Sequence, residues 1–332
     1  MRLRYVLLAL AASALAMAGP ASSDTVTLRP SVHMLGEWVD GMVFDGSSIW
    51  VAETGQSSLA QLNATYGVAR RVKLAGAPRK IDIGRDGAIY ALIESDDQTR
   101  LWQQLPGSAA GKVIAGLEGV RCGVTLATGD GPFVWVLSGC DDETAVLIRI
   151  DPKTGALAKV PLGPGGGGEL LVRQGEVWVG IDRLSVVDES TLAVRSSDIQ
   201  NKLGPQVFFS AFAADVALVY SAIGSDTTKL VVAIDPATLQ ETARAAVDQT
   251  INAIVADAQN VVAVGSEGRI FVLAARTLAL QRVVNLPVPE VEPRAGMIRN
   301  GELLITDFRV KTEKERGALL VLRGWRTAAA PK

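Results

Sequence analysis

The side chains best able to do chemistry in this 332-residue chain are carboxylates and arginines, because histidine and cysteine are nearly absent. The chain has one histidine, His33, and two cysteines, Cys122 and Cys140. A single histidine excludes a metal site built from several histidines, and any Ser-His or Cys-His mechanism would have to use it. Two cysteines cannot supply the four thiolates of a zinc ribbon or an iron–sulfur cluster. No catalytic residue is therefore predicted, and His33 is expected to be structural.

Arginines recur just before short apolar runs, in Pro78-Arg79-Lys80, Val120-Arg121-Cys122 and Pro293-Arg294-Ala295, and Asp40 takes the related position in an earlier run. Arginines that converge on one point bind a carboxylate or phosphate through two parallel hydrogen bonds. The alternative is that they pair with nearby acidic residues and do nothing more. The candidate ligand-binding residues are thus Asp40, Arg79, Arg121 and Arg294.

Acidic residues offer a second, competing site. Glu37, Glu53 and Asp307 carry carboxylate oxygens, which calcium and magnesium prefer as ligands. A divalent ion held there would activate water or polarise a carbonyl group. The other interpretation is that these residues are only part of solvated polar loops.

A sevenfold repeat must position these residues. A glycine or polar turn followed by an apolar run recurs with its centre at Trp50, Tyr90, Trp135, Trp178, Tyr220, Val262 and Leu304, at intervals of 40, 45, 43, 42, 42 and 42 residues. The runs are short and rich in valine, isoleucine and aromatic residues, which indicates strands. A unit of about 42 residues with four short strands is typical of one propeller blade. The sequence predicts an all-β, seven-bladed β-propeller that forms a single domain over residues 24–327.

The two ends of the chain are predicted to meet. The seventh unit contains only three expected strands, at Gly296–Ile298, Leu303–Thr306 and Ala318–Leu322. The segment Thr25–Arg29 alternates like a strand and has no blade of its own. We expect it to form the outer strand of the last blade, because a closed ring leaves no exposed edge. Residues 328–332 are expected to be a disordered tail.

The repeats resemble those of secreted propellers grouped around streptogramin lyase, NHL and YVTN proteins. The resemblance is carried by SSIWVAETGQSSLAQL (47–62), GEVWVGID (175–182) and RIDPKTGAL (149–157). It implies a propeller fold, which hosts lyases, lactonases, quinone enzymes and binding modules. The lyases use histidine and glutamate with a magnesium ion, and His33 lies outside any matching position, so the lyase activity is not expected here.

Residues 1–23 form a predicted secretory signal peptide. Arg2 and Arg4 precede an apolar run from Tyr5 to Ala18, which ends in the small-x-small pattern Ala16-Met17-Ala18. This run is shorter than the roughly 20 residues needed to cross a bilayer. Cleavage near Ala18 would release the protein into the periplasm or the medium, with no membrane span.

Cys122 and Cys140 are predicted to form a disulfide. They flank a turn centred near residue 131, and this symmetry places them opposite each other in an antiparallel hairpin. Directly opposite residues lie about 4.5–5.5 Å apart, within reach of a disulfide. The rival interpretation is a pair of buried thiols or a redox site, although no C-x-x-C motif is present.

These observations favour a monomeric binding or protein-interaction scaffold, whose partner is an unknown protein or small-molecule ligand in the periplasm. Nucleic acid is excluded as a partner by the balance of 33 Lys and Arg against 35 Asp and Glu. No cofactor is expected for this function. The alternative is a metal-assisted lactonase or lyase, with a calcium or magnesium ion on the carboxylates of the same face.

Overall fold

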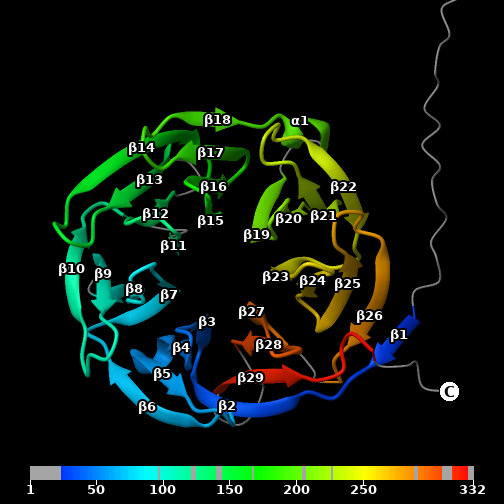
Figure 1. The fold of residues 1–332 in the computed structure, drawn as a ribbon, viewed down its shortest axis with the longest axis horizontal. Coiled ribbons are helices and arrows are strands. Elements are labelled where there is room, and N and C mark those ends of the chain that lie inside the picture. The colour runs from blue at the N-terminus through cyan, green and yellow to red at the C-terminus, as the bar shows by residue number, and fades with distance from the viewer. Residues whose placement is uncertain are drawn as a thin grey trace, which may run out of the picture.

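Short strands rich in valine, isoleucine and aromatic residues pair into antiparallel sheets that form a ring (Figure 1). The computed structural model describes residues 24–95, 98–120, 125–139, 144–166, 168–203, 207–225, 227–287, 291–308 and 316–327. Within these ranges there are seven sheets, and helix is confined to η1 (Thr54–Gln56) and α1 (Ile199–Leu203). The prediction of an all-β, seven-bladed propeller is confirmed. No helix in the described ranges has the length and apolar character needed to cross a membrane.

Each blade begins with its innermost strand and ends with its outermost strand. Blades one to three consist of β3 (Val39–Phe44), β4 (Ile49–Glu53), β5 (Ser58–Leu62) and β6 (Val68–Lys73); β7 (Ala77–Ile83), β8 (Ile89–Ser95), β9 (Gln98–Gln104) and β10 (Lys112–Leu117); and β11 (Thr125–Thr128), β12 (Val134–Ser138), β13 (Thr144–Ile150) and β14 (Leu157–Pro164). Blades four and five consist of β15 (Glu169–Arg173), β16 (Glu176–Gly180), β17 (Leu184–Asp188) and β18 (Val194–Ser196); and β19 (Phe208–Ala214), β20 (Val219–Gly224), β21 (Lys229–Ile234) and β22 (Glu241–Ala246).

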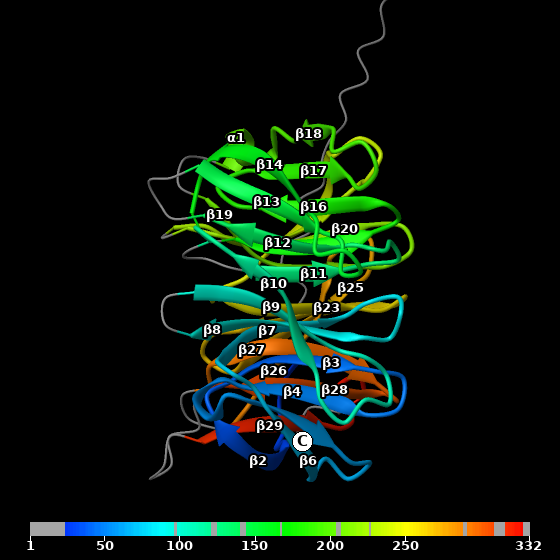
Figure 2. The same cartoon turned by 90° about the vertical axis from the view of Figure 1, so that its left-hand side faces the viewer.

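The last two blades involve the N-terminal segment as well. Blade six consists of β23 (Ile251–Ala256), β24 (Asn260–Gly265), β25 (Arg269–Ala274) and β26 (Leu280–Asn285), with β1 (Asp24–Thr27) added outside; blade seven consists of β27 (Pro293–Arg299), β28 (Glu302–Asp307), β29 (Arg316–Leu322) and β2 (Ser31–Glu37). Figure 2 shows the ring from the side, with the strands crossing its thickness and the loops on two opposite faces.

Closure of the ring corrects one detail of the sequence prediction. An N-terminal strand does close blade seven, but it is β2, antiparallel to β29, and not Thr25–Arg29. Strand β1 instead runs parallel to β26 as a fifth strand of blade six. Val26 is buried there and pairs directly with Val284, within an apolar cluster that blades six and seven share. Pro30 has no N–H group to donate and separates the two strands.

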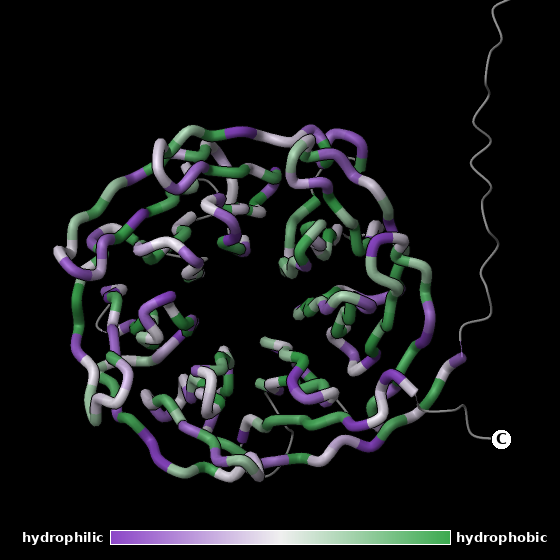
Figure 3. Tube along the Cα trace, in the orientation of Figure 1, coloured by the Kyte–Doolittle hydropathy of each residue, from purple (hydrophilic) through white to green (hydrophobic). Residues whose placement is uncertain are grey.

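The hydrophobic core lies between neighbouring blades. Tyr90 of blade two and Val136 of blade three belong to one buried cluster, and Trp178 of blade four packs in another with Phe209 of blade five. The recurrent aromatic position of the sequence is therefore a packing position. The outermost strands alternate between hydrophobic and hydrophilic residues (Figure 3), as expected for strands with one face in solvent.

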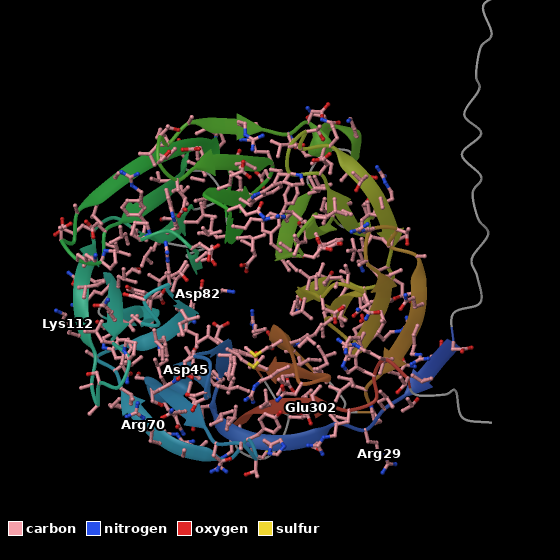
Figure 4. All side chains as sticks on the ribbon, in the orientation of Figure 1. Arg29, Asp45, Arg70, Asp82, Lys112 and Glu302 are labelled. Carbon is pink, nitrogen blue, oxygen red and sulfur yellow. The ribbon has the colours of Figure 1, made fainter. Side chains whose placement is uncertain are left out.

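Aspartates fix the turns that lead into the second strands. Asp45, labelled in Figure 4, accepts hydrogen bonds from the backbone N–H of Ser47 and Ser48 and from Trp50 Nε1, at 2.8, 2.7 and 2.7 Å. Asp215 accepts a comparable bond from the Tyr220 hydroxyl at 2.8 Å. An aspartate that caps a turn backbone and also binds an aromatic side chain fixes both the turn and the packing position.

Candidate functional site at the channel mouth

A polar cavity of about 310 Å³ lies where the innermost strands begin. Every blade contributes to it, and its lining consists of Asp40, Lys80, Thr125, Gly168, Glu169, Ser210, Asn252, Pro293 and Arg294. We call this cavity the channel mouth. The ends of the second strands lie on the same face, since Val39 pairs with Glu53 and Pro293 pairs with Asp307.

Bulges in the innermost strands distinguish the mouth from the rest of the sheet. The register shifts at the start of the innermost strand in blades one, two, five, six and seven. Each shift leaves at least one residue outside the ladder, and these residues include Asp40, Arg79, Ser210, Asn252 and Arg294. A bulge re-aims a side chain locally, so it releases these positions from the alternation of the strand.

Lys80 and Glu169 connect blades two and four across the mouth. Lys80 Nζ lies 3.2 Å from Glu169 Oε1, and the Thr125 hydroxyl of blade three donates to Glu169 Oε2 at 3.4 Å. The negative charge of Glu169 raises the pKa of Lys80, which burial alone would lower. Lys80 therefore stays protonated in the mouth at neutral pH.

Asp40 is the second carboxylate of the mouth. Burial raises its pKa, and the positive charges of Lys80, Arg294 and Arg79 offset only part of that effect. Its backbone carbonyl accepts a hydrogen bond from the Thr306 hydroxyl at 3.2 Å. Within the described ranges no hydrogen bond or ion pair to its carboxylate is present, so that group retains its capacity to accept bonds.

Arg294 is held in place by an aromatic stack. Its guanidinium lies over the Phe308 ring, 4.5 Å from the centroid, and also pairs with Glu292. Phe308 stacks in turn on Trp38, with 6.3 Å between centroids and 17° between planes. Trp38 has a positive φ of 52°, an uncommon conformation for a large side chain. This stack fixes a positive charge beside Asp40.

The four candidate ligand-binding residues have different positions. Asp40 and Arg294 line the mouth. Arg79 does not, because its guanidinium pairs with Glu94 at 2.8 Å, and the neighbouring Lys80 lines the cavity instead. Arg121 lies outside the described residues.

Sequence reasoning missed five polar lining residues, namely Lys80, Thr125, Glu169, Ser210 and Asn252. Two of them could have been found from the sequence, because Lys80 adjoins a candidate arginine and Glu169 directly follows the glycine-rich run 163–168. The bulges that place Ser210 and Asn252 at the mouth leave no mark in residue type, and Thr125 simply opens the regular strand β11.

The carboxylates of the metal hypothesis do not converge. Glu53 is fully buried and accepts bonds from Gly36 N, the Ser58 hydroxyl and both Nε and Nη2 of Arg71, at 2.7–2.9 Å. Asp307 is also fully buried and accepts a bond from Glu292 N at 2.8 Å. Glu37 is exposed at the end of β2. In the part of the chain that the structure describes, no three histidine, cysteine, aspartate or glutamate side chains are arranged to hold a metal ion.

His33 lies away from the channel mouth, on an outermost strand. His33 lies on β2, opposite Leu319, and its ring makes an edge contact with Tyr66 at 5.4 Å between centroids. Cys122 and Cys140 lie outside the described residues, so the disulfide stays a prediction. The neighbouring pairs are those that the predicted symmetry requires, since Thr125 pairs with Leu137 and Thr128 with Val134.

Comparisons with known proteins support the fold alone. No family model matches the chain, and no curated protein matches it. Among solved structures, the computationally designed Ika8 protein is 16% identical, with a TM-score of 0.58, over 90% of this chain and 100% of that one. BamB from Moraxella catarrhalis is also 16% identical, with a TM-score of 0.55, over 85% of this chain and 84% of that one. At this identity the likeness shows a shared propeller architecture, and the particular repeat group remains a prediction.

Proposed function

We propose that the protein is a periplasmic or secreted binding module that holds a protein partner or a small-molecule ligand at the channel mouth. One observation carries the proposal, namely that all seven blades contribute to a single open polar cavity. Its volume of about 310 Å³ falls at the lower end of small-ligand pockets, which span roughly 300–1,000 Å³.

The chemistry of the mouth supports recognition of a polar and asymmetric partner. Equivalent blades supply different groups there, with carboxylates from Asp40 and Glu169 and cations from Lys80 and Arg294. Neutral hydrogen-bonding groups come from the remaining blades. Propeller packing depends on the apolar positions between blades, so the side chains at the mouth are available for binding.

The location is supported by the sequence, through the signal-peptide pattern in residues 1–23, which lie outside the described residues. The metal-assisted lactonase or lyase has less support. Two of its three carboxylates, Glu53 and Asp307, are buried and hydrogen-bonded within the protein.

Partner capture from periplasmic extract tests the proposal. The immobilised protein is crosslinked to bound molecules, which are then identified by mass spectrometry. We expect the Arg294→Glu variant to capture at least tenfold less partner than the unsubstituted protein, because the charge at the mouth is reversed. Lys153→Ala is the matched control, since Lys153 lies in the turn after β13, on the opposite face. Equal capture by all three proteins, or no capture and no ligand at all, would contradict the proposal.

A further inference from the structure

An apolar slot lies beside the channel mouth, between blades four and five. It has a volume of about 260 Å³, and its lining consists of Gly166, Gly168, Glu169, Ile181, Phe208, Phe209 and Ser210. Gly168, Glu169 and Ser210 also line the mouth. The polar cavity and the apolar slot therefore adjoin, and Glu169 lines both.

Glycine backbone and aromatic rings shape the slot. A Cβ on Gly168 would lie 2.2 Å from the Gly180 carbonyl oxygen, and the φ of Gly168 is +123°. Only glycine fits there, so no side chain from this position fills the slot. On the other side, Phe208 covers Gly224, its partner in the adjacent strand, yet 42% of Phe208 remains exposed. A large apolar side chain left exposed beside a polar cavity is a candidate ligand contact.

The ion pair at the junction can open to a ligand. The contact between Lys80 and Glu169 is long, at 3.2 Å, and the two side chains are 30% and 28% exposed. A ligand with one charge would bind one partner and take it away from the other, which costs free energy in a partly buried site. A ligand with both charges replaces both halves of the pair, with its cation on Glu169 and its anion on Lys80.

We propose that the mouth and the slot together bind an α-amino acid with an apolar side chain. Its ammonium group lies on Glu169, its carboxylate on Lys80, and its side chain in the slot against Phe208. This inference rests on the proposed function and gives the ligand class for the same site. It uses two features of the site together, namely the paired charges and the adjoining apolar slot.

Titration calorimetry with defined ligands tests the inference. L-Leucine is compared with isopentylamine, which lacks the carboxylate, with 4-methylpentanoate, which lacks the ammonium group, and with glycine, which lacks the side chain. We expect leucine to bind at least about tenfold more tightly than each of the three, because a charge-assisted bond or a buried side chain contributes that much. No leucine binding at millimolar concentration, or equal affinity for all four, would overturn the inference.

Two variants locate the binding site. Glu169→Gln and Phe208→Ser are each expected to weaken leucine binding at least about tenfold. Val216→Ser is the control, because Val216 is 91% exposed in a turn on the opposite face. Circular dichroism and thermal melts establish that each variant is folded. Leucine affinity unchanged in both folded variants would contradict the assigned site.

The capture and calorimetry results together distinguish failure of this inference from failure of the proposed function. A partner captured through the mouth by a protein that binds no leucine would overturn the inference and leave the proposed function intact. Leucine binding that Glu169→Gln abolishes supports both.

Discussion

Lys80 Nζ lies 3.2 Å from Glu169 Oε1, although the two residues belong to blades two and four and are separated by the whole of blade three. Blade three takes part in this contact as well, because its Thr125 hydroxyl donates a hydrogen bond to Glu169. One carboxylate thus ties three blades together at the mouth.

The pair should contribute modestly to stability. In a double-mutant cycle of Lys80→Met and Glu169→Gln, we expect a coupling free energy of about 0.5–1 kcal/mol, because both side chains are partly exposed and screened. Urea unfolding measures it. The control cycle uses the more exposed pair Lys202 and Asp198, where we expect a coupling close to zero. A mouth coupling as small as the control would contradict the prediction.

Glu53 should matter more for folding than for binding. We expect Glu53→Gln to lower the free energy of unfolding by about 2–3 kcal/mol, because the buried carboxylate loses its ion pair with Arg71. Glu94→Gln is the matched control, since the pair between Glu94 and Arg79 is exposed and should contribute less than about 1 kcal/mol. Similar losses in both variants would show that burial is not the deciding factor.

Asp40 should destabilise the folded protein as the pH rises. Its pKa in the folded state is above the ordinary value of 3.8, so folding favours the protonated form. Asp40→Asn should therefore gain stability relative to the unsubstituted protein as the pH rises from below 3.8 through the raised pKa. Urea unfolding at several pH values measures this trend, and a flat difference would contradict it.

Asp188 provides the opposite sign for comparison. Hydrogen bonds from Ser190 and Thr191 lower its pKa to about 2. Its contribution to stability is therefore present above 3.8 and is lost as the pH falls towards 2. Asp188→Asn should lose stability relative to the unsubstituted protein at neutral pH and recover it in acid.

Metal addition separates the two functional hypotheses. For a binding module, the melting temperature should not change with millimolar calcium or magnesium, because a ligand raises stability only by binding the folded state. A rise in melting temperature that is lost in Glu37→Gln would favour the metal-assisted lactonase or lyase instead.

The predicted disulfide is tested by intact-mass measurement. We expect the native protein to be lighter than the reduced protein by the mass of two hydrogen atoms. Alkylation of two thiols in the unreduced protein would end the hypothesis.

The repeat could be predicted from the sequence because packing between blades demands the same kind of residue in each unit. Trp50, Tyr90, Trp135 and Trp178 all occupy that position, and all are buried. The prediction of the closing strand was wrong because alternation alone does not show which blade a strand joins. Thr25–Arg29 alternates well, but Val26 pairs with Val284 of blade six, within a cluster that blades six and seven share.

The site was less accessible to prediction because side-chain direction at the mouth depends on bulges. The sequence placed an arginine at 79, but the bulge between Pro78 and Lys80 leaves Lys80 in the cavity and Arg79 paired with Glu94. The joining of Glu169 to Lys80 depends on the curvature of the ring and on no local pattern.

The placement of β1 and β2 imposes an order on folding. Strands β1 and β2, the most N-terminal strands of the described chain, pair with β26 and β29, which lie near its other end. These contacts span nearly the whole chain, and such distant pairings form slowly. We therefore expect the N-terminal segment to remain unpaired until blades six and seven exist, so that ring closure is the final, rate-limiting event. A chain without β1 and β2 should form the individual blades but should not close the propeller ring.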